Sequence, residues 1–118
     1  MESPSQQKSL KQAIAPHITQ IITELKQTIT QKYSLLEMRL FGSTARGDAT
    51  KDSDIDIFIR LPEINRRIEE DVFDMAYALE LKYDCLIDVI ILADSTLKRY
   101  SEQLPIYQNI LHDGLLVW

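Results

Sequence analysis

The stretch GSTARGDATKDSDIDIFI, residues 42–59, places four aspartates after a Gly-Ser pair and carries the last two into a run of isoleucines. Residues 54–61 read as a strand whose successive side chains point to opposite faces: Ile55, Ile57 and Ile59 share one side, and Asp54, Asp56 and Phe58 share the other. Carboxylates rarely stand inside a strand unless something compensates their charge. Asp54 and Asp56 are therefore the first candidates for a functional site.

Helical and strand patterns alternate along the rest of the chain. Apolar residues spaced three and four apart predict one helix that begins near Pro16 and carries an isoleucine stripe over residues 14–29. A second helix is expected between Pro62 and the strand of residues 86–92, which is apolar on both faces. Residues 35–41 form another expected strand, with an apolar face made by Leu36, Met38 and Leu40.

The C-terminal part is expected to hold two short helices and a last strand. Ser95 fits an N-cap, Pro105 interrupts the helix, and Gly114 fits a left-handed C-cap before the short strand in LLVW. These elements together predict an α/β (α+β) fold, a small mixed sheet of three to four strands flanked by helices.

Length and composition narrow the class of protein. The chain of 118 residues predicts a single domain over residues 1–118, with residues 1–8 as a flexible tail. No apolar run is long enough to span a membrane, the start of the chain lacks a signal sequence, and Cys85 is the only cysteine, so we expect a cytoplasmic protein. The net charge of −5 disfavours direct binding of nucleic acid.

The predicted topology brings a third carboxylate to the same edge. The connection of residues 62–85 is long enough for a crossover between parallel strands, which would place Asp88 at the same end of the sheet as Asp54. Three neighbouring carboxylates repel one another unless protons or cations compensate them. Mg²⁺ is held by carboxylates together with substrate phosphates, and two such ions can assist displacement at phosphorus.

Gly42 and Ser43 supply the second half of a phosphate site. A residue without Cβ lets the backbone approach an anion, and a helical turn beginning at this point would add free N–H groups. Arg46 and Lys51, in the loop that follows, carry charges that could reach a β- or γ-phosphate.

At these residues the sequence resembles the DNA polymerase β-like nucleotidyltransferases, whose signature is Gly-Ser, ten residues, then Asp-x-Asp, with a third Asp on a later strand. Gly42-Ser43, the Asp54-Ile55-Asp56 triplet and Asp88 match that signature without a gap. More narrowly, the chain from about Leu35 onward resembles the minimal nucleotidyltransferases, the MNT antitoxins encoded beside HEPN-domain toxins. The isoleucine stripe at the N-terminus is less characteristic of them and is interpreted as an accessory helix or a contact surface.

The resemblance implies a polymerase β-like fold and transfer of AMP from ATP, with Mg²⁺, onto a tyrosine of a HEPN ribonuclease toxin. It implies that Asp54, Asp56 and Asp88 hold the metal ions and that Asp88 also helps to deprotonate the acceptor. Gly42 and Ser43 would bind the triphosphate, with Arg46 at the motif's basic position.

Other interpretations of the same residues stay open. The protein could neutralise a partner by binding alone, or transfer a nucleotide to a small molecule, although 118 residues leave no room for a second, acceptor-binding domain. Asp88 could simply pair with an arginine, and Asp84 and Asp94 flank the same strand. Cys85 and the tyrosines are expected to be packing residues.

Overall fold

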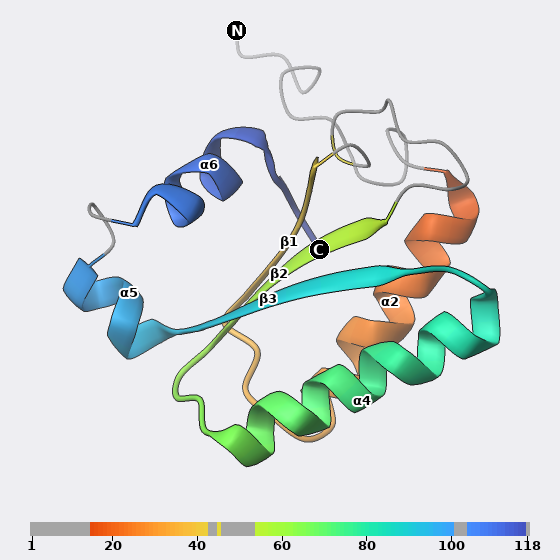
Figure 1. Ribbon diagram of the computed structural model, residues 1–118, viewed down its shortest axis with the longest axis horizontal. Coiled ribbons are helices and arrows are strands. Elements are labelled where there is room, and N and C mark those ends of the chain that lie inside the picture. Colours follow the sequence, from red (N-terminus) through yellow and green to blue (C-terminus); the bar gives the residue numbers. More distant parts are fainter. Residues whose placement is uncertain (1–14, 43–44, 46–53, 101–103, 118) are drawn as a thin grey trace, which may run out of the picture.

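The strand that carries the aspartates lies inside a four-stranded sheet. The computed structural model describes residues 15–42, 45, 54–100 and 104–117 (Figure 1). Its strands are β1 (Glu37–Phe41), β2 (Ile55–Leu61), β3 (Ile87–Ala93) and β4 (Leu115–Leu116), in the order β3-β2-β1-β4. β1 is antiparallel to both β2 and β4, whereas β2 and β3 are parallel and are joined by helix α4 (Arg66–Tyr83). The predicted small mixed sheet flanked by helices is confirmed.

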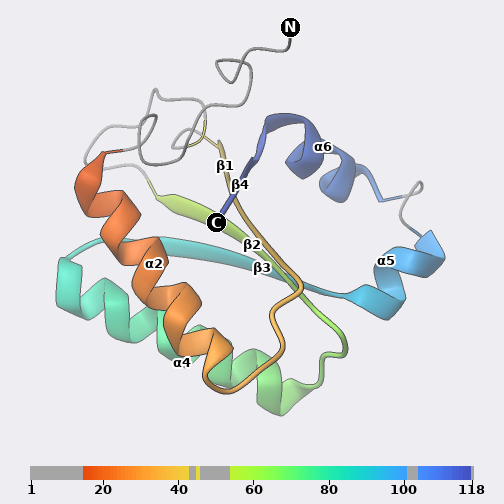
Figure 2. The same ribbon diagram turned by 180° about the vertical axis from the view of Figure 1, so that it is seen from behind.

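The alternation of β2 separates two layers of helices. Its isoleucines are fully buried with apolar residues of α2 (Pro16–Thr30) and α4, which lie side by side on one face of the sheet (Figures 1 and 2). Phe58 points the other way and is fully buried with residues of α5 (Asp94–Tyr100) and α6 (Pro105–Asp113). The face that carries Asp54 and Asp56 is therefore the face covered in part by α5 and α6.

Helix α2 belongs to the main core, which corrects its interpretation as an accessory helix or contact surface. Its isoleucine and leucine stripe is buried, and polar contacts join the helix and the segment that follows it to α4. The hydroxyl of Tyr33 donates to Asp71 at 2.5 Å, and Lys82 pairs with Glu24 at 2.9 Å. None of the helices within the described ranges is long and apolar enough to cross a membrane.

Two predictions, one for Leu36 and one for Gly114, were wrong for local reasons. Leu36 is exposed rather than buried, because the strand begins only at Glu37. Gly114 is extended (φ −83°, ψ 154°) and not left-handed. It is needed there because a Cβ would lie 2.4 Å from the carbonyl oxygen of Ile110. The left-handed cap occurs instead at Asp84, which ends α4 with φ 53° and ψ 57°.

The start of α5 also differs from expectation. The helix begins at Asp94, so Ser95 lies within it and its hydroxyl contacts Glu63 at 3.4 Å. The predicted short final strand is confirmed as β4. The tail predicted for residues 1–8 falls outside the described residues.

Candidate active site

Three strands place their ends at one edge of the sheet. β1 ends at Phe41, directly opposite Asp56 of β2, and Asp56 is in register with Asp88 of β3. Paired residues on neighbouring strands point to the same face, with the strands about 4.8 Å apart. The expected antiparallel and parallel pairings are thus both observed, and Asp54, Asp56 and Asp88 belong to one edge and one face.

Gly42 closes this edge on the side of β1. It follows Phe41 with a left-handed φ of 72°, and a Cβ at this position would lie 2.2 Å from Oδ2 of Asp56. Only a residue without a side chain leaves that carboxylate where it is. The glycine corner therefore lies directly beside the second aspartate of the pair, Asp56.

The carboxylates form an open group. Asp54 and Asp88 are exposed, and Asp56 is half-buried. Within the described ranges, no group of three or more His, Cys, Asp or Glu side chains is placed so that it could hold a metal ion. Mg²⁺ is usually held by one or two carboxylates, with substrate phosphates and water as its remaining ligands. The carboxylate of Asp56, beside the Gly42 corner, offers oxygen donors of that kind.

The other candidates for the third carboxylate have structural tasks. Asp84 caps α4, and Asp94 pairs with Arg60 at 2.5 Å and with Lys98 at 3.2 Å. No ion pair found among the described residues includes Asp88. Of these three carboxylates around β3, Asp88 is therefore the one that lies at the same edge of the sheet as Asp56 and forms no salt bridge with the described residues.

Ser43, Arg46 and Lys51 lie outside the described residues. The part of Ser43 and Arg46 in binding phosphate stays a prediction from the sequence. Gly42 fixes the point from which that loop departs, directly beside Asp56.

The arrangement of strands and carboxylates matches a known family. The sequence of residues 22–116 matches the family model of the nucleotidyltransferase domain, and this range includes all four strands of the described sheet and all three aspartates. The chain belongs to the nucleotidyltransferase domain family.

A relative of this nucleotidyltransferase is MJ0141 of Methanocaldococcus jannaschii, which carries the name protein adenylyltransferase. The two are 39% identical over 77 residues, covering 63% of this chain and 78% of MJ0141. This identity extends the family relationship to proteins named for the transfer of AMP to proteins.

Solved structures share the fold of this nucleotidyltransferase. A toxin–antitoxin complex crystallised with AMP-PNP matches with a TM-score of 0.60 and 19% identity over 85% of this chain and 72% of that chain. A complex of the tri-AMPylated Shewanella oneidensis HEPN toxin with its MNT antitoxin matches with a TM-score of 0.55 and 19% identity, covering 86% and 70%. At these identities the likeness concerns the fold.

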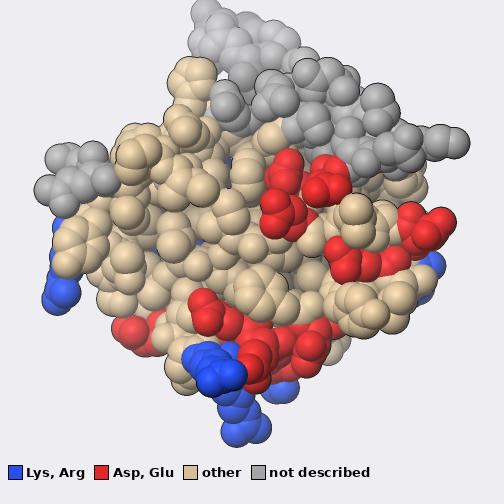
Figure 3. All heavy atoms as spheres, viewed as in Figure 1, with Lys and Arg blue, Asp and Glu red and all other residues tan. Residues whose placement is uncertain are grey.

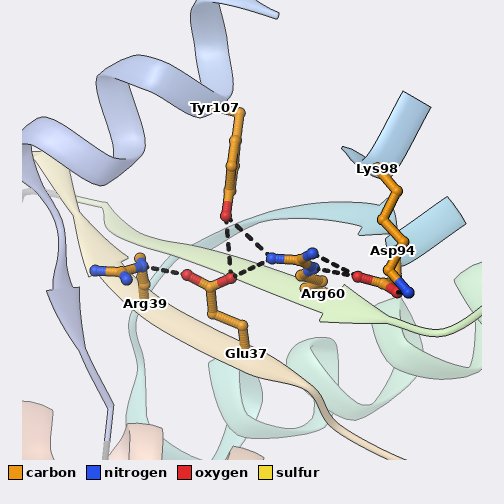
Figure 4. A network of polar contacts seen from close by, with 6 residues as sticks. All are labelled: Glu37, Arg39, Arg60, Asp94, Lys98 and Tyr107. Atoms are coloured by element: carbon orange, nitrogen blue, oxygen red, sulfur yellow. Dashed lines mark hydrogen bonds and ion pairs between the residues drawn. The ribbon is translucent and has the colours of Figure 1, made fainter. Parts of the chain in front are cut away.

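At the other end of the same sheet face, the nucleotidyltransferase holds a neutralised polar network (Figure 4). Arg60 lies opposite Glu37 in the strand register and donates to it at 3.1 Å. It also donates to Asp94 at 2.8 Å and to the hydroxyl of Tyr107 at 3.1 Å. Tyr107 in turn donates to Glu37 at 3.2 Å, and Arg39 contacts the other oxygen of Glu37. The network ties β1, β2, α5 and α6 together.

The network also shifts the acidity of its members. Burial is the largest influence on Glu37 and acts to raise its pKa, but the hydrogen bonds from Arg39 and Arg60 outweigh it and hold the pKa below its ordinary value. The hydrogen bond from Arg60, followed by that from Lys98, lowers the pKa of Asp94. Both carboxylates are therefore ionised partners of the arginine at neutral pH.

The sequence did not reveal this network. Glu37 and Arg39 resembled the solvated face of a strand, and Tyr107 was interpreted as a packing residue, which it also is, with its ring 5.5 Å from that of Phe58. The one available signal was Arg60, a charged residue inside the isoleucine run. Cys85 behaves as expected, because partial burial raises the pKa of its thiol and disfavours a reactive thiolate.

Proposed function

We propose that this nucleotidyltransferase transfers AMP from ATP to a tyrosine of a HEPN ribonuclease toxin and so acts as its antitoxin. The observation that carries the proposal is the position of Asp56 between Gly42 on one neighbouring strand and Asp88 on the other. The same reaction is supported by a relative named as a protein adenylyltransferase and by a structural neighbour, an MNT antitoxin in complex with a tri-AMPylated HEPN toxin. In this proposal the reaction takes place in the cytoplasm.

The residues divide into two groups in this proposal. Asp54, Asp56 and Asp88 are the ligands for Mg²⁺, which would supply charge stabilisation for the transferred phosphoryl group. Gly42 leaves room for the triphosphate, and Ser43 and Arg46 are expected to bind it from the loop that follows.

The chemical step is a displacement at the α-phosphorus. The tyrosine hydroxyl oxygen forms a bond to that phosphorus, and the bond to the bridging oxygen of the β-phosphate breaks, so that pyrophosphate leaves. In this proposal Asp88 accepts the proton of the hydroxyl, because it is exposed and lies on the edge strand β3, across β2 from the glycine corner. Alignment and electrostatic stabilisation by the sheet edge provide most of the acceleration.

The test follows label from α-labelled ATP to the HEPN-domain partner. Asp54→Asn and Asp56→Asn are expected to reduce transfer by at least about 100-fold while the proteins stay folded. Glu63→Gln, a carboxylate just beyond the other end of β2, is the matched control and should transfer normally. Full transfer by either aspartate variant would refute the proposal.

Two further outcomes would point to the alternatives. Aspartate variants that transfer no label but still protect cells from the toxin would indicate neutralisation by binding. Label recovered only in the small-molecule fraction of a lysate would indicate a small-molecule acceptor.

A further inference from the structure

The order of the strands separates the phosphate side of the site from the acceptor side. Gly42 follows β1, Asp56 lies in β2 and Asp88 in β3, so the three positions follow one another across the sheet. With the triphosphate at Gly42 and the proton acceptor at Asp88, the acceptor approaches over β3. This strand is one of the two outer strands of the described sheet, and within the described residues no strand pairs with its far side.

Leu86 stands on this approach. Its carbonyl oxygen accepts a hydrogen bond from the amide of Ile55 at 2.9 Å, which places it beside the start of β2. Ile87 is buried against the layer of α2 and α4, so its neighbours Leu86 and Asp88 are directed to the opposite face. Leu86 is 60% exposed and directly precedes Ile87 and the candidate catalytic carboxylate of Asp88.

Helix α4, on the other face of the sheet, carries a second exposed apolar surface. Phe73, Tyr77 and Leu81 follow one another at four-residue spacing and therefore share one stripe of the helix. They are 47%, 59% and 69% exposed, and the helix leads through Asp84 directly into β3. We call Phe73, Tyr77, Leu81 and Leu86 the docking row. Three exposed apolar side chains on one helical stripe differ from the single exposed apolar residues that are normal on a surface.

The surroundings of the docking row are acidic. Asp74, Asp84 and Asp88 are exposed, while Lys82, the only basic residue in the segment 73–88, is paired with Glu24 of α2 at 2.9 Å. Figure 3 shows uncharged surface on this face, with acidic groups around it and basic groups toward its margins. Acidic borders on both sides would repel a second copy of this chain, whereas they attract a basic partner.

We infer that the docking row binds the protein acceptor, through an apolar patch of the acceptor bordered by Lys or Arg side chains close to the modified tyrosine. The inference rests on the proposed function and names the surface on which that function depends. Leu86 is a positioning residue in this arrangement: it contacts the acceptor next to Asp88 and takes no part in the chemistry.

The chain offers a matched pair of leucines for the test. Leu36 is 51% exposed and lies at the opposite end of the sheet, where its amide bonds to Arg60. Leu86→Ser and Leu36→Ser therefore remove the same side chain from opposite ends of the sheet. Leu86→Met is a third variant, which keeps an apolar side chain at position 86. The probe is the purified HEPN-domain protein encoded beside this chain. Its KM in label transfer, its Kd by calorimetry and the stabilisation by ATP with Mg²⁺ are measured for each variant.

Leu86→Ser is expected to raise the KM and the Kd for the partner about tenfold, with kcat within about twofold of the unchanged protein. Leu36→Ser and Leu86→Met should match the unchanged protein, and stabilisation by ATP should be equal in all four. Raising the salt concentration about tenfold should weaken binding further, because it screens the acidic border. Leu81→Ser provides a second variant of the row if Leu86→Ser does not fold.

Equal KM and Kd for the two serine variants would overturn the inference, as would a loss of kcat at unchanged KM. A dimer of the unchanged protein that Leu86→Ser dissociates would also overturn it, because a second copy would then occupy the row. If the unchanged protein transfers no label, the proposed function fails, and the calorimetric comparison still decides whether the row binds the partner.

Discussion

Replacing Gly42 with alanine is expected to impair catalysis far more than folding. The new Cβ would lie 2.2 Å from Oδ2 of Asp56 and 3.1 Å from its Cγ. Non-bonded carbon and oxygen atoms settle about 1 Å farther apart than the shorter of these distances. The carboxylate is the mobile end of a side chain, so it turns away and the backbone stays in place.

Both consequences can be given a size. A left-handed alanine costs about 1–2 kcal/mol relative to glycine, which lowers the melting temperature of a chain of this length by about 4–8 °C. A displacement of about 1 Å at a group that aligns the reaction costs about 100-fold in rate. The expected result is a protein that is still folded at 25 °C with kcat/KM for label transfer reduced about 100-fold.

Gly114→Ala is the matched control. Its Cβ would lie 2.4 Å from the carbonyl oxygen of Ile110, a backbone atom, so the cost falls on packing and is about 1–3 kcal/mol. Activity per folded molecule should change by less than about threefold, because α6 and β4 do not carry the carboxylates. If Gly42→Ala loses no more activity per folded molecule than Gly114→Ala, the argument from the contact with Asp56 is wrong.

Three further predictions concern the scaffold. Phe58→Ala should lower the free energy of unfolding by about 3–5 kcal/mol in urea titrations, because Phe58 is fully buried between the sheet and α6. Asn65→Ala should cost about 1 kcal/mol, since the side chain of Asn65 accepts from the amide of Ile68 at 2.8 Å and caps α4; Asn65→Asp, which keeps the acceptor, should cost little. Glu37 has a folded-state pKa below its ordinary value, so its stabilisation is complete above about pH 4.3 and is lost as the pH falls through the folded-state pKa. Glu37→Gln should therefore be less stable than the unchanged protein at pH 7, and acid unfolding curves should show the difference shrinking below about pH 4.

The central strands could be predicted because their patterns are local. The two-residue period of residues 54–61 and the proline that follows define β2, and the length of the connection to β3 requires a crossover. Parallel pairing then brings Asp88 into register with Asp56 to within a residue. The contact of Gly42 with Asp56 follows in the same way, from the antiparallel return of β1.

The network of Glu37 and Arg60 could not be predicted, because it depends on segments far apart in the chain. Alternating charges in β1 suggest a solvated face, and only the packing of α6, which starts at Pro105, covers that face and brings Tyr107 to the two charges. Leu86 was missed for a related reason. The sequence does not show that β3 is an edge strand of the sheet, and the exposure of Leu86 depends on that position.

The outward positions of β2 explain how one sheet face can serve both stability and chemistry. Along the strand these positions are exposed Asp54, half-buried Asp56, fully buried Phe58 and then Arg60. The charge of Arg60 is neutralised by its hydrogen bonds to Glu37 and Asp94. Apolar burial and paired charges anchor the second half of the strand, so like charges in the first half do not loosen the sheet. Rotation of side chains on binding of a cation or nucleotide is then confined to the open half, where the backbone positions are already fixed by the anchored half. A site built in this way aligns its ligands through the strand register, and its specificity for an acceptor must come from the surface that borders the open half.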